Sequence, residues 1–419
     1  MDCELASNRH GPAALSVAPN APRHVPALAA PPTRHPDLSF ADGNIAILTG
    51  SVYFVVHNGL LARQSPPLQQ ASKNLDLRLQ LEGRPILALP DSPQDMALFL
   101  AALYDCLLLD IKLDPPNFST VCALLRLATK YQTKFRSYLL DQLQRVHWPT
   151  RLAQWDTRET EATIGSAYDA RACYAHPILV INLARAIDAP ALLPSAFYDL
   201  SRSACRWFVE CAPRSALFTL VGVSVSVLNG MRSGAGCSKC LRGALPIQKA
   251  QQVQTALSAD RAPQTTYTFE ISCIDHQGIS HQLSPDDLMN LLKGREHASR
   301  FLSTFIVNEL EGREPSGNCL NMRLEDPAQR RACQAAFESV TFEILRDVNG
   351  VTERSSDPLF AMLDAELMQT RESQVSALRA CEFCRLEFGA AVDQAREEFW
   401  LKMPAWFGVE SELELTGWG

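Results

Sequence analysis

The stretch that most constrains the fold is FADGNIAILTGSVYFVVHNGLLARQSP, residues 40–66. A turn signal, Asp-Gly-Asn, precedes two β-rich runs, IAIL and VYFVV, which a second turn separates. Two such runs joined by a turn predict a β-hairpin. HNGLLARQ then predicts a short helix. Ser-Pro-Pro predicts its end, because the residue before a proline disfavours the helical conformation.

The next hundred residues predict one small sheet covered by helices. PILALP (85–90) predicts a buried strand, and Asp91 or Ser92 is expected to cap a helix over 93–110. A helix over 118–132 is expected to have Ser119 or Thr120 as its N-cap, and another helix is expected over 134–146. A hairpin, a helix, a strand and three helices predict an α+β fold class.

Most of the remaining chain carries helical periodicity. The predicted helices cover 176–202 with a break at Ala189-Pro190, 285–311 with a break at Gly294, 328–348, 359–370, and 372–402 with a stop at Pro404. Trp406 and Trp418 are expected to dock the end of the chain. Residues 206–268 lack a clean period.

These patterns divide the chain into six predicted segments. They are a disordered Pro/Ala-rich tail (1–36), an α+β domain (37–147), a helical linker region (148–205), an irregular insertion of low order (206–268), a C-terminal helical domain (269–410) and a tail (411–419).

Composition narrows the class of protein. The 419 residues carry a net charge of −7, so no broad nucleic-acid-binding surface is predicted. No apolar run reaches the roughly 18–20 residues that span a bilayer, so no membrane partner is predicted. The first residues lack a secretory apolar segment, and we expect an intracellular protein, cytoplasmic or nuclear. The 13 cysteines are therefore interpreted as reduced thiols.

The opening stretch resembles a BTB/POZ domain over about residues 37–147. The resemblance rests on a strand with an aspartate (DGNIAI), an aromatic-x-x-His strand end, a leucine-containing helix, a Ser-Pro step, and LPDSPQDMALFLAALYDC. HPDLSFADGNI, LLRLATKY, DPLFAMLDAELMQTR and AREEFWLKMPAWFGV are similar to BTB-domain proteins that basidiomycete fungi carry in large numbers.

That resemblance implies a protein–protein interaction module without catalytic activity. It implies a homodimer, an adaptor or scaffold role, and a contact with a cullin-type ubiquitin ligase. The interaction residues it implies are Asp42, His57, Asn58, Leu60 and Leu61. Two departures stand out: Asn58 occupies the place of a basic residue, and we expect the polar run 67–80 to replace a helix of the partner face.

Two side chains in this region have alternative interpretations. His57 could be a general base, but no nucleophile or acid is placed with it, and a histidine held by backbone groups is favoured. Asp42 either caps the turn or pairs with a cation such as Arg63, and the turn cap is favoured.

Two sets of residues have the types and spacing of zinc ligands. The first is Cys237, Cys240, Cys273 and His276, a C-x2-C…C-x2-H pattern. The second is Cys381 and Cys384, expected on one helix face, with Cys319 and Cys333 as partners. Buried cysteines are also ordinary small apolar residues. No cofactor is otherwise expected, and no phosphate-loop or hydrolase motif occurs. The alternative function is a zinc-stabilised, transcription-associated regulator.

Overall fold

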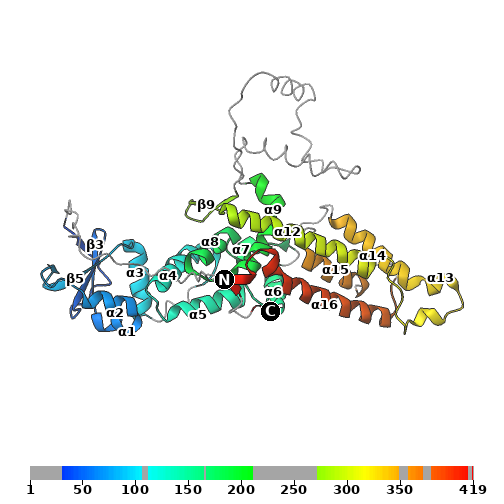
Figure 1. Cartoon of the computed structure of the whole chain (residues 1–419), viewed down its shortest axis with the longest axis horizontal. Helices are drawn as coiled ribbons and strands as arrows, with labels where there is room; N and C mark the ends of the chain where they lie inside the picture. Colours follow the sequence, from blue (N-terminus) through cyan, green and yellow to red (C-terminus); the bar gives the residue numbers. More distant parts are fainter. Residues whose placement is uncertain are drawn as a thin grey trace, which may run out of the picture.

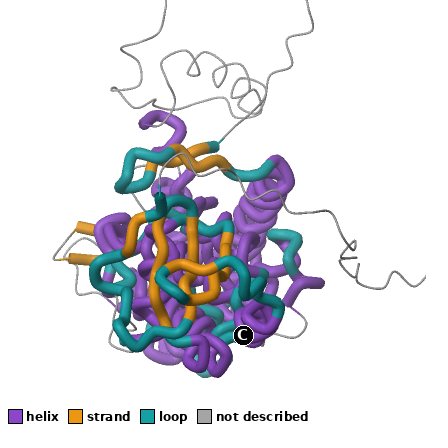
Figure 2. The backbone as a smooth tube through the Cα atoms, turned by 90° about the vertical axis from the view of Figure 1, so that its left-hand side faces the viewer, coloured by secondary structure: helices purple, strands orange, loops and turns teal. Residues whose placement is uncertain are grey.

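The computed structural model describes residues 31–105, 112–164, 167–210, 271–348, 357–370, 379–413 and 418. A small sheet lies at one end of an elongated molecule, and helices extend from it as far as α13 at the other end (Figure 1). Figure 2 looks from the sheet end, with the strands in front of the helices. The predicted α+β fold class is confirmed.

The sheet has five strands in the order β1-β3-β2-β5-β4. Their bounds are β1 Thr33–Arg34, β2 Ile45–Thr49, β3 Val52–Val56, β4 Gln80–Leu81 and β5 Arg84–Leu89. The predicted hairpin is β2–β3, which is antiparallel, and β5 pairs with β2 in parallel. Gly50, in the turn between β2 and β3, has φ +55°, a backbone conformation that glycine adopts without steric cost.

Two predictions about this sheet were wrong. The predicted tail 1–36 contains a strand, because β1 pairs with β3. Residues 1–30 lie outside the described residues. The strand β5 was expected to be buried, but Leu87 is its one fully buried residue. The short hairpin β4–β5 leaves the rest of β5 near the edge of the sheet.

Seven helical segments follow the hairpin and cover the sheet. They are α1 Asn58–Gln64, α2 Pro66–Lys73, α3 Pro93–Tyr104, η2 Pro115–Asn117, α4 Phe118–Lys130, α5 Phe135–Gln142 and the π-turn η3 Leu143–His147. Apolar side chains of β2, β3, α1, α2, α3 and α4 form the core beneath the sheet. The N-cap of α4 is Asn117, not Ser119 or Thr120, because η2 leads directly into this helix.

The helix α2 contradicts the expectation that the polar run after Pro66 replaces a helix. Ser65 ends α1 and its hydroxyl oxygen accepts a hydrogen bond from the Leu68 N–H, 3.1 Å away. Prolines occupy the first helical positions, where a missing N–H costs nothing. Leu68 is buried, and the other face of α2 remains polar.

The second half of the molecule is helical apart from short strands. Its elements are α6 Leu152–Glu161, β6 Thr163–Ile164, β7 Ala167–Tyr168, α7 Ala170–Cys173, α8 Pro177–Ile187, η4 Pro190–Leu192, α9 Leu193–Glu210, β8 Ser272–Ile274, β9 Ser280–Gln282, α12 Pro285–Phe305, η7 Ile306–Leu310, η8 Leu320–Arg323, α13 Pro327–Arg330, α14 Ala332–Val348, α15 Pro358–Thr370, α16 Glu382–Trp406 and α17 Glu410–Leu413. The predicted break at Ala189-Pro190 is confirmed by η4. The helix predicted over 328–348 is divided between α13 and α14.

Neither predicted helix breaker interrupts its helix. The helix α12 continues through Gly294, where a Cβ atom would lie 2.0 Å from the ring of Phe407. Gly294 is therefore a packing site for that ring. The helix α16 continues past Pro404, whose missing N–H leaves the Trp400 carbonyl without its helical donor. The indole N–H of Trp418 donates to that carbonyl at 3.0 Å, which confirms the expected docking of Trp418.

Several predicted segments fall partly outside the described residues. The helix predicted over 93–110 ends at Tyr104, and 106–111 are not described. Helix α9 extends to Glu210, within the predicted insertion 206–268, of which 211–268 are not described. The helix predicted from 372 begins at Glu382, and 371–378 are not described. In the predicted tail 411–419, Leu413 is buried.

One large apolar core runs from α4 and α5 to α17 and therefore crosses the predicted boundary at residue 147. It includes side chains of α8, α9, α12, α14 and α16. Within the described ranges, no helix has the length and apolar character needed to cross a membrane.

Candidate functional site

Four cysteines from three separate segments meet at the far end of the helical region. Cys319 precedes η8, Cys333 lies in the first turn of α14, and Cys381 and Cys384 lie at the start of α16. These are the residues of the second predicted zinc set. Their sulfur atoms all lie within 4.8 Å of one another. Cys381 was predicted to share one face of a helix with Cys384. It is instead the N-cap of α16, immediately before the helix begins.

The sulfur atoms contact one another without disulfide bonds. Cys319 Sγ lies 3.6 Å from Cys333 Sγ and 3.7 Å from Cys381 Sγ. All four cysteines are free thiols. Cys319, Cys333 and Cys384 are buried, and Cys381 is partly exposed.

The environment of the cluster shifts the pKa values of its thiols in different directions. Burial raises the pKa of Cys333 to about 11 and raises that of Cys384 above the usual range. Burial also opposes ionisation of Cys381, but hydrogen bonds from the backbone N–H groups of Cys384 and Leu320 outweigh it and lower its pKa to about 7. The start of α16 also favours negative charge.

The first predicted zinc set is not assembled in the described residues. Cys237 and Cys240 lie outside them. Cys273 is buried in the large apolar core as part of β8, whereas His276 lies exposed in the turn before β9.

A second group of polar side chains surrounds His57 at the end of β3. Its Nδ1 lies 2.8 Å from the hydroxyl oxygen of Tyr104, which also accepts the His57 backbone N–H at 2.9 Å. Its Nε2 lies 3.2 Å from Asp42 Oδ2. The ring of Phe40 stacks on that of Tyr104 at 4.5 Å. Side chains, and not backbone groups alone, therefore fix His57, which corrects the favoured interpretation.

Asp42 pairs with this histidine. The hydrogen bond from His57 lowers the pKa of Asp42, whose side chain is 84% exposed. Arg63, the proposed cation, is exposed on α1. The arginine that holds the turn is Arg84 of β5, whose guanidinium donates to the carbonyl oxygens of Gly43 at 2.7 Å and Ala41 at 2.8 Å.

The remaining predicted interaction residues lie on α1. The Asn58 N–H donates to Asn44 Oδ1 at 2.8 Å, so it helps to close the hairpin. Leu61 is fully buried beneath the sheet, and Leu60 is partly exposed. Of the two leucines, only Leu60 has apolar surface exposed to solvent.

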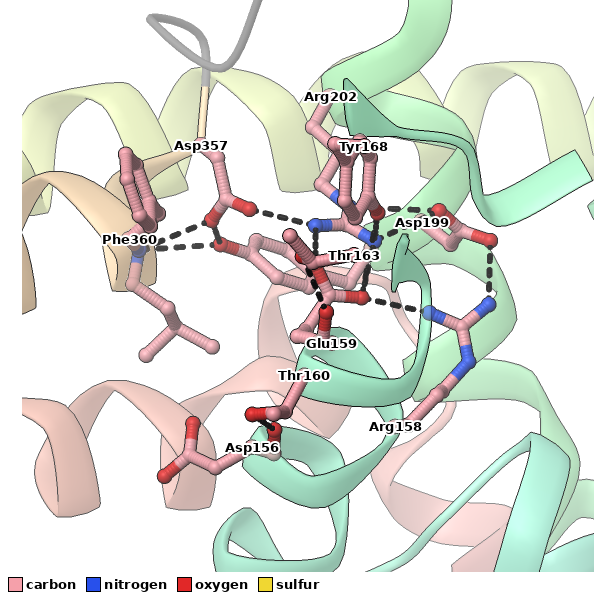
Figure 3. Close-up of polar contacts among 12 residues, drawn as sticks. Asp156, Arg158, Glu159, Thr160, Thr163, Tyr168, Asp199, Arg202, Asp357 and Phe360 are labelled. Carbon is pink, nitrogen blue, oxygen red and sulfur yellow. Dashed lines mark hydrogen bonds and ion pairs between the residues drawn. The ribbon is translucent and has the colours of Figure 1, made fainter. Parts of the chain in front are cut away.

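A third polar cluster is buried in the helical region, and its residues were not predicted (Figure 3). Arg158 of α6 contacts Asp199 of α9 at 2.9 Å and Glu159 at 2.8 Å. Arg202 of α9 contacts Glu159 at 2.6 Å and Asp357 at 2.5 Å. Because Asp357 precedes α15, this network joins α6, α9 and α15.

Aromatic rings lie against this network. Among the described residues, its three arginines are Arg158, Arg171 and Arg202, and its three carboxylates are those of Glu159, Asp199 and Asp357. The Arg158 guanidinium lies 4.9 Å from the ring of Trp148, 4.7 Å from that of Trp155 and 4.3 Å from that of Tyr174. Burial opposes ionisation of Asp199, but Arg171, Arg158 and Arg202 outweigh it and hold its pKa below the usual range. This arrangement suits a structural brace.

Comparison with known proteins does not assign the chain to a group. No protein-family model matches it, and no curated protein matches its sequence.

Proposed function

We propose that this chain is a protein–protein interaction adaptor that forms a homodimer through its N-terminal α+β unit. The observation that carries the proposal is the order of elements after β1. The hairpin β2–β3, the helices α1 and α2, the parallel strand β5 and the helices α3 to α5 follow one another as the BTB/POZ resemblance implies.

The outer surface of the hairpin and α1 supplies a suitable contact face. Asp42 is exposed beside His57, Leu60 is partly exposed, and Arg63 is exposed one helical turn away. A second copy meeting this face would cover the apolar surface of Leu60 and bring Asp42 near cations of its partner.

Leu60→Asp is expected to abolish self-association with little change in thermal stability. An aspartate at the centre of a dimer contact would be buried without a partner, whereas on a free surface it is solvated. The measurement is co-purification of two differently tagged full-length copies. Leu401→Asp is the matched control, since Leu401 is 59% exposed on α16, and the helices α16 and α1 are well separated in Figure 1. Equal co-purification of both variants would place the contact elsewhere.

A cullin-type scaffold is the proposed partner of the dimer. The helix α2 supports this extension, because Pro66–Lys73 forms a helix in the first part of the segment 67–80, which was expected to lack a contact helix. Purified cullin at micromolar concentration should be retained by the full chain. If none is retained, the adaptor proposal is restricted to other partners.

A further inference from the structure

We propose that Cys319, Cys333, Cys381 and Cys384 together bind one Zn²⁺ ion in a structural site with four thiolate ligands. The inference is independent of whether the chain forms a dimer, because the cluster lies at the opposite end of the molecule from the sheet.

The sulfur spacing matches a single tetrahedral ion. Zinc–sulfur bonds are about 2.3 Å long, so the sulfurs of a tetrahedral site lie about 3.8 Å apart. The measured contacts of Cys319 with Cys333 and with Cys381 are 3.6 and 3.7 Å, and no pair of sulfurs exceeds 4.8 Å. The four sulfur atoms therefore lie close enough together to bind one ion.

Two other uses of the cysteines fit this spacing less well. A disulfide needs its two sulfur atoms about 2.0 Å apart. To form two disulfides, the four sulfurs would have to move into two closer pairs. An iron–sulfur cluster attaches its cysteines to different iron atoms and therefore needs a wider ligand set than a single ion. Four thiolates around one ion suit zinc, and a single iron ion is the competing occupant that the metal analysis below distinguishes.

Donors around the sulfurs suit a site that carries negative charge. The backbone N–H of Cys381 and the side-chain amide of Asn321 both lie 3.2 Å from Cys333 Sγ. The Ser316 N–H donates to Cys384 Sγ at 3.3 Å. Four thiolates and Zn²⁺ have a net charge of −2, and such N–H groups are the partners that orient and stabilise metal-bound sulfur.

The bound ion would have a structural role, because it would hold the segment between η7 and α14 in place. Cys319 is the one buried residue between Leu310 and Cys333, and nearly all side chains of η8 and α13 are exposed. A single buried thiol contributes too little apolar burial to offset the conformational entropy of ordering so long a segment. A zinc–sulfur bond at Cys319 would anchor the segment to α14 and α16.

Metal content is the first test of the site. Full-length protein purified from zinc-supplemented cells should contain about 1 zinc ion per chain by elemental analysis, with little iron. Cys333→Ser and Cys381→Ser should each lower zinc below about 0.2 per chain. A wild-type value below about 0.2 zinc per chain, or iron in place of zinc, would overturn the proposal.

Matched variants separate this site from the other cysteines. Cys122→Ser removes a buried thiol outside the cluster, and Cys273→Ser removes a member of the first predicted set. Both should retain zinc. Loss of zinc in Cys273→Ser with retention in Cys333→Ser would place the metal elsewhere and contradict the proposal.

Trypsin digestion tests the anchoring role without any substitution that could prevent folding. Arg323, Arg330 and Arg331 are exposed in the segment that Cys319 anchors. Removal of zinc from the wild-type chain with a chelator should speed cleavage at these arginines about tenfold or more, and added Zn²⁺ should restore protection. Unchanged cleavage after confirmed zinc loss would show that the ion does not order this segment.

Discussion

Replacing Arg158 with methionine is expected to lower the free energy of unfolding by about 3–5 kcal/mol. Arg158 is buried and joins Asp199, Glu159 and the His147 carbonyl. Methionine is similar in length but removes one of the three arginines of the buried network, so Arg171 and Arg202 remain to balance the three carboxylates that the structure describes there. The loss of this buried positive charge outweighs the apolar area gained. Chemical denaturation of the full chain measures the change.

Arg145→Met is the control for this substitution. Arg145 forms an exposed pair with Asp141 one helical turn away, and its side chain is 66% exposed. Solvent screens such a pair, so the control is expected to change stability by less than about 0.5 kcal/mol. A similar small loss in Arg158→Met would mean that the buried network is not a brace.

Acidification is expected to destabilise the fold through two histidines, His147, which is buried, and His176, which is partly buried. Burial, with the nearby charge of Arg171, lowers the pKa of His176 to about 3, and burial together with Arg158 lowers that of His147 to about 4. Both values lie below the ordinary 6.5 of the unfolded chain. The unfolded state therefore binds more protons, and stability falls as pH drops from about 6.5 towards these values.

His176→Asn isolates one of the two histidines. The Nδ1 atom of His176 caps α8 by accepting the Ile178 N–H at 3.2 Å, and asparagine is also a good N-cap. Between about pH 7 and pH 5 the variant should lose roughly 2 kcal/mol less stability than the wild type. Parallel pH profiles for the two proteins would contradict the assignment of a neutral histidine at position 176 in the folded state.

Local sequence signals correctly predicted the elements that are determined by neighbouring residues in the chain. The hairpin β2–β3 follows from alternating apolar runs with a turn, and Ser92 caps α3 as its position before Pro93 indicates. The same signals failed where a distant contact decides the outcome. Gly294 was predicted to break a helix, but Phe407, far along the chain, packs against it.

The candidate sites divide in the same way. Four cysteines in the C-terminal third suggested a metal set, although their convergence depends on how η8, α14 and α16 pack. The buried ionic network had no local signal. Arg202 and Asp357 are separated by 155 positions and by residues that the structure does not describe. The order of arginines and aspartates along a helix does not show which of them will be buried together.

The molar mass of the full chain in solution tests the proposed adaptor most directly. Light scattering after size-exclusion chromatography should give twice the chain mass of 46.3 kDa at micromolar concentration. The Leu60→Asp variant should give the mass of a single chain. A wild-type protein that remains a monomer of 46.3 kDa across that range would contradict the proposal that the N-terminal unit forms a homodimer.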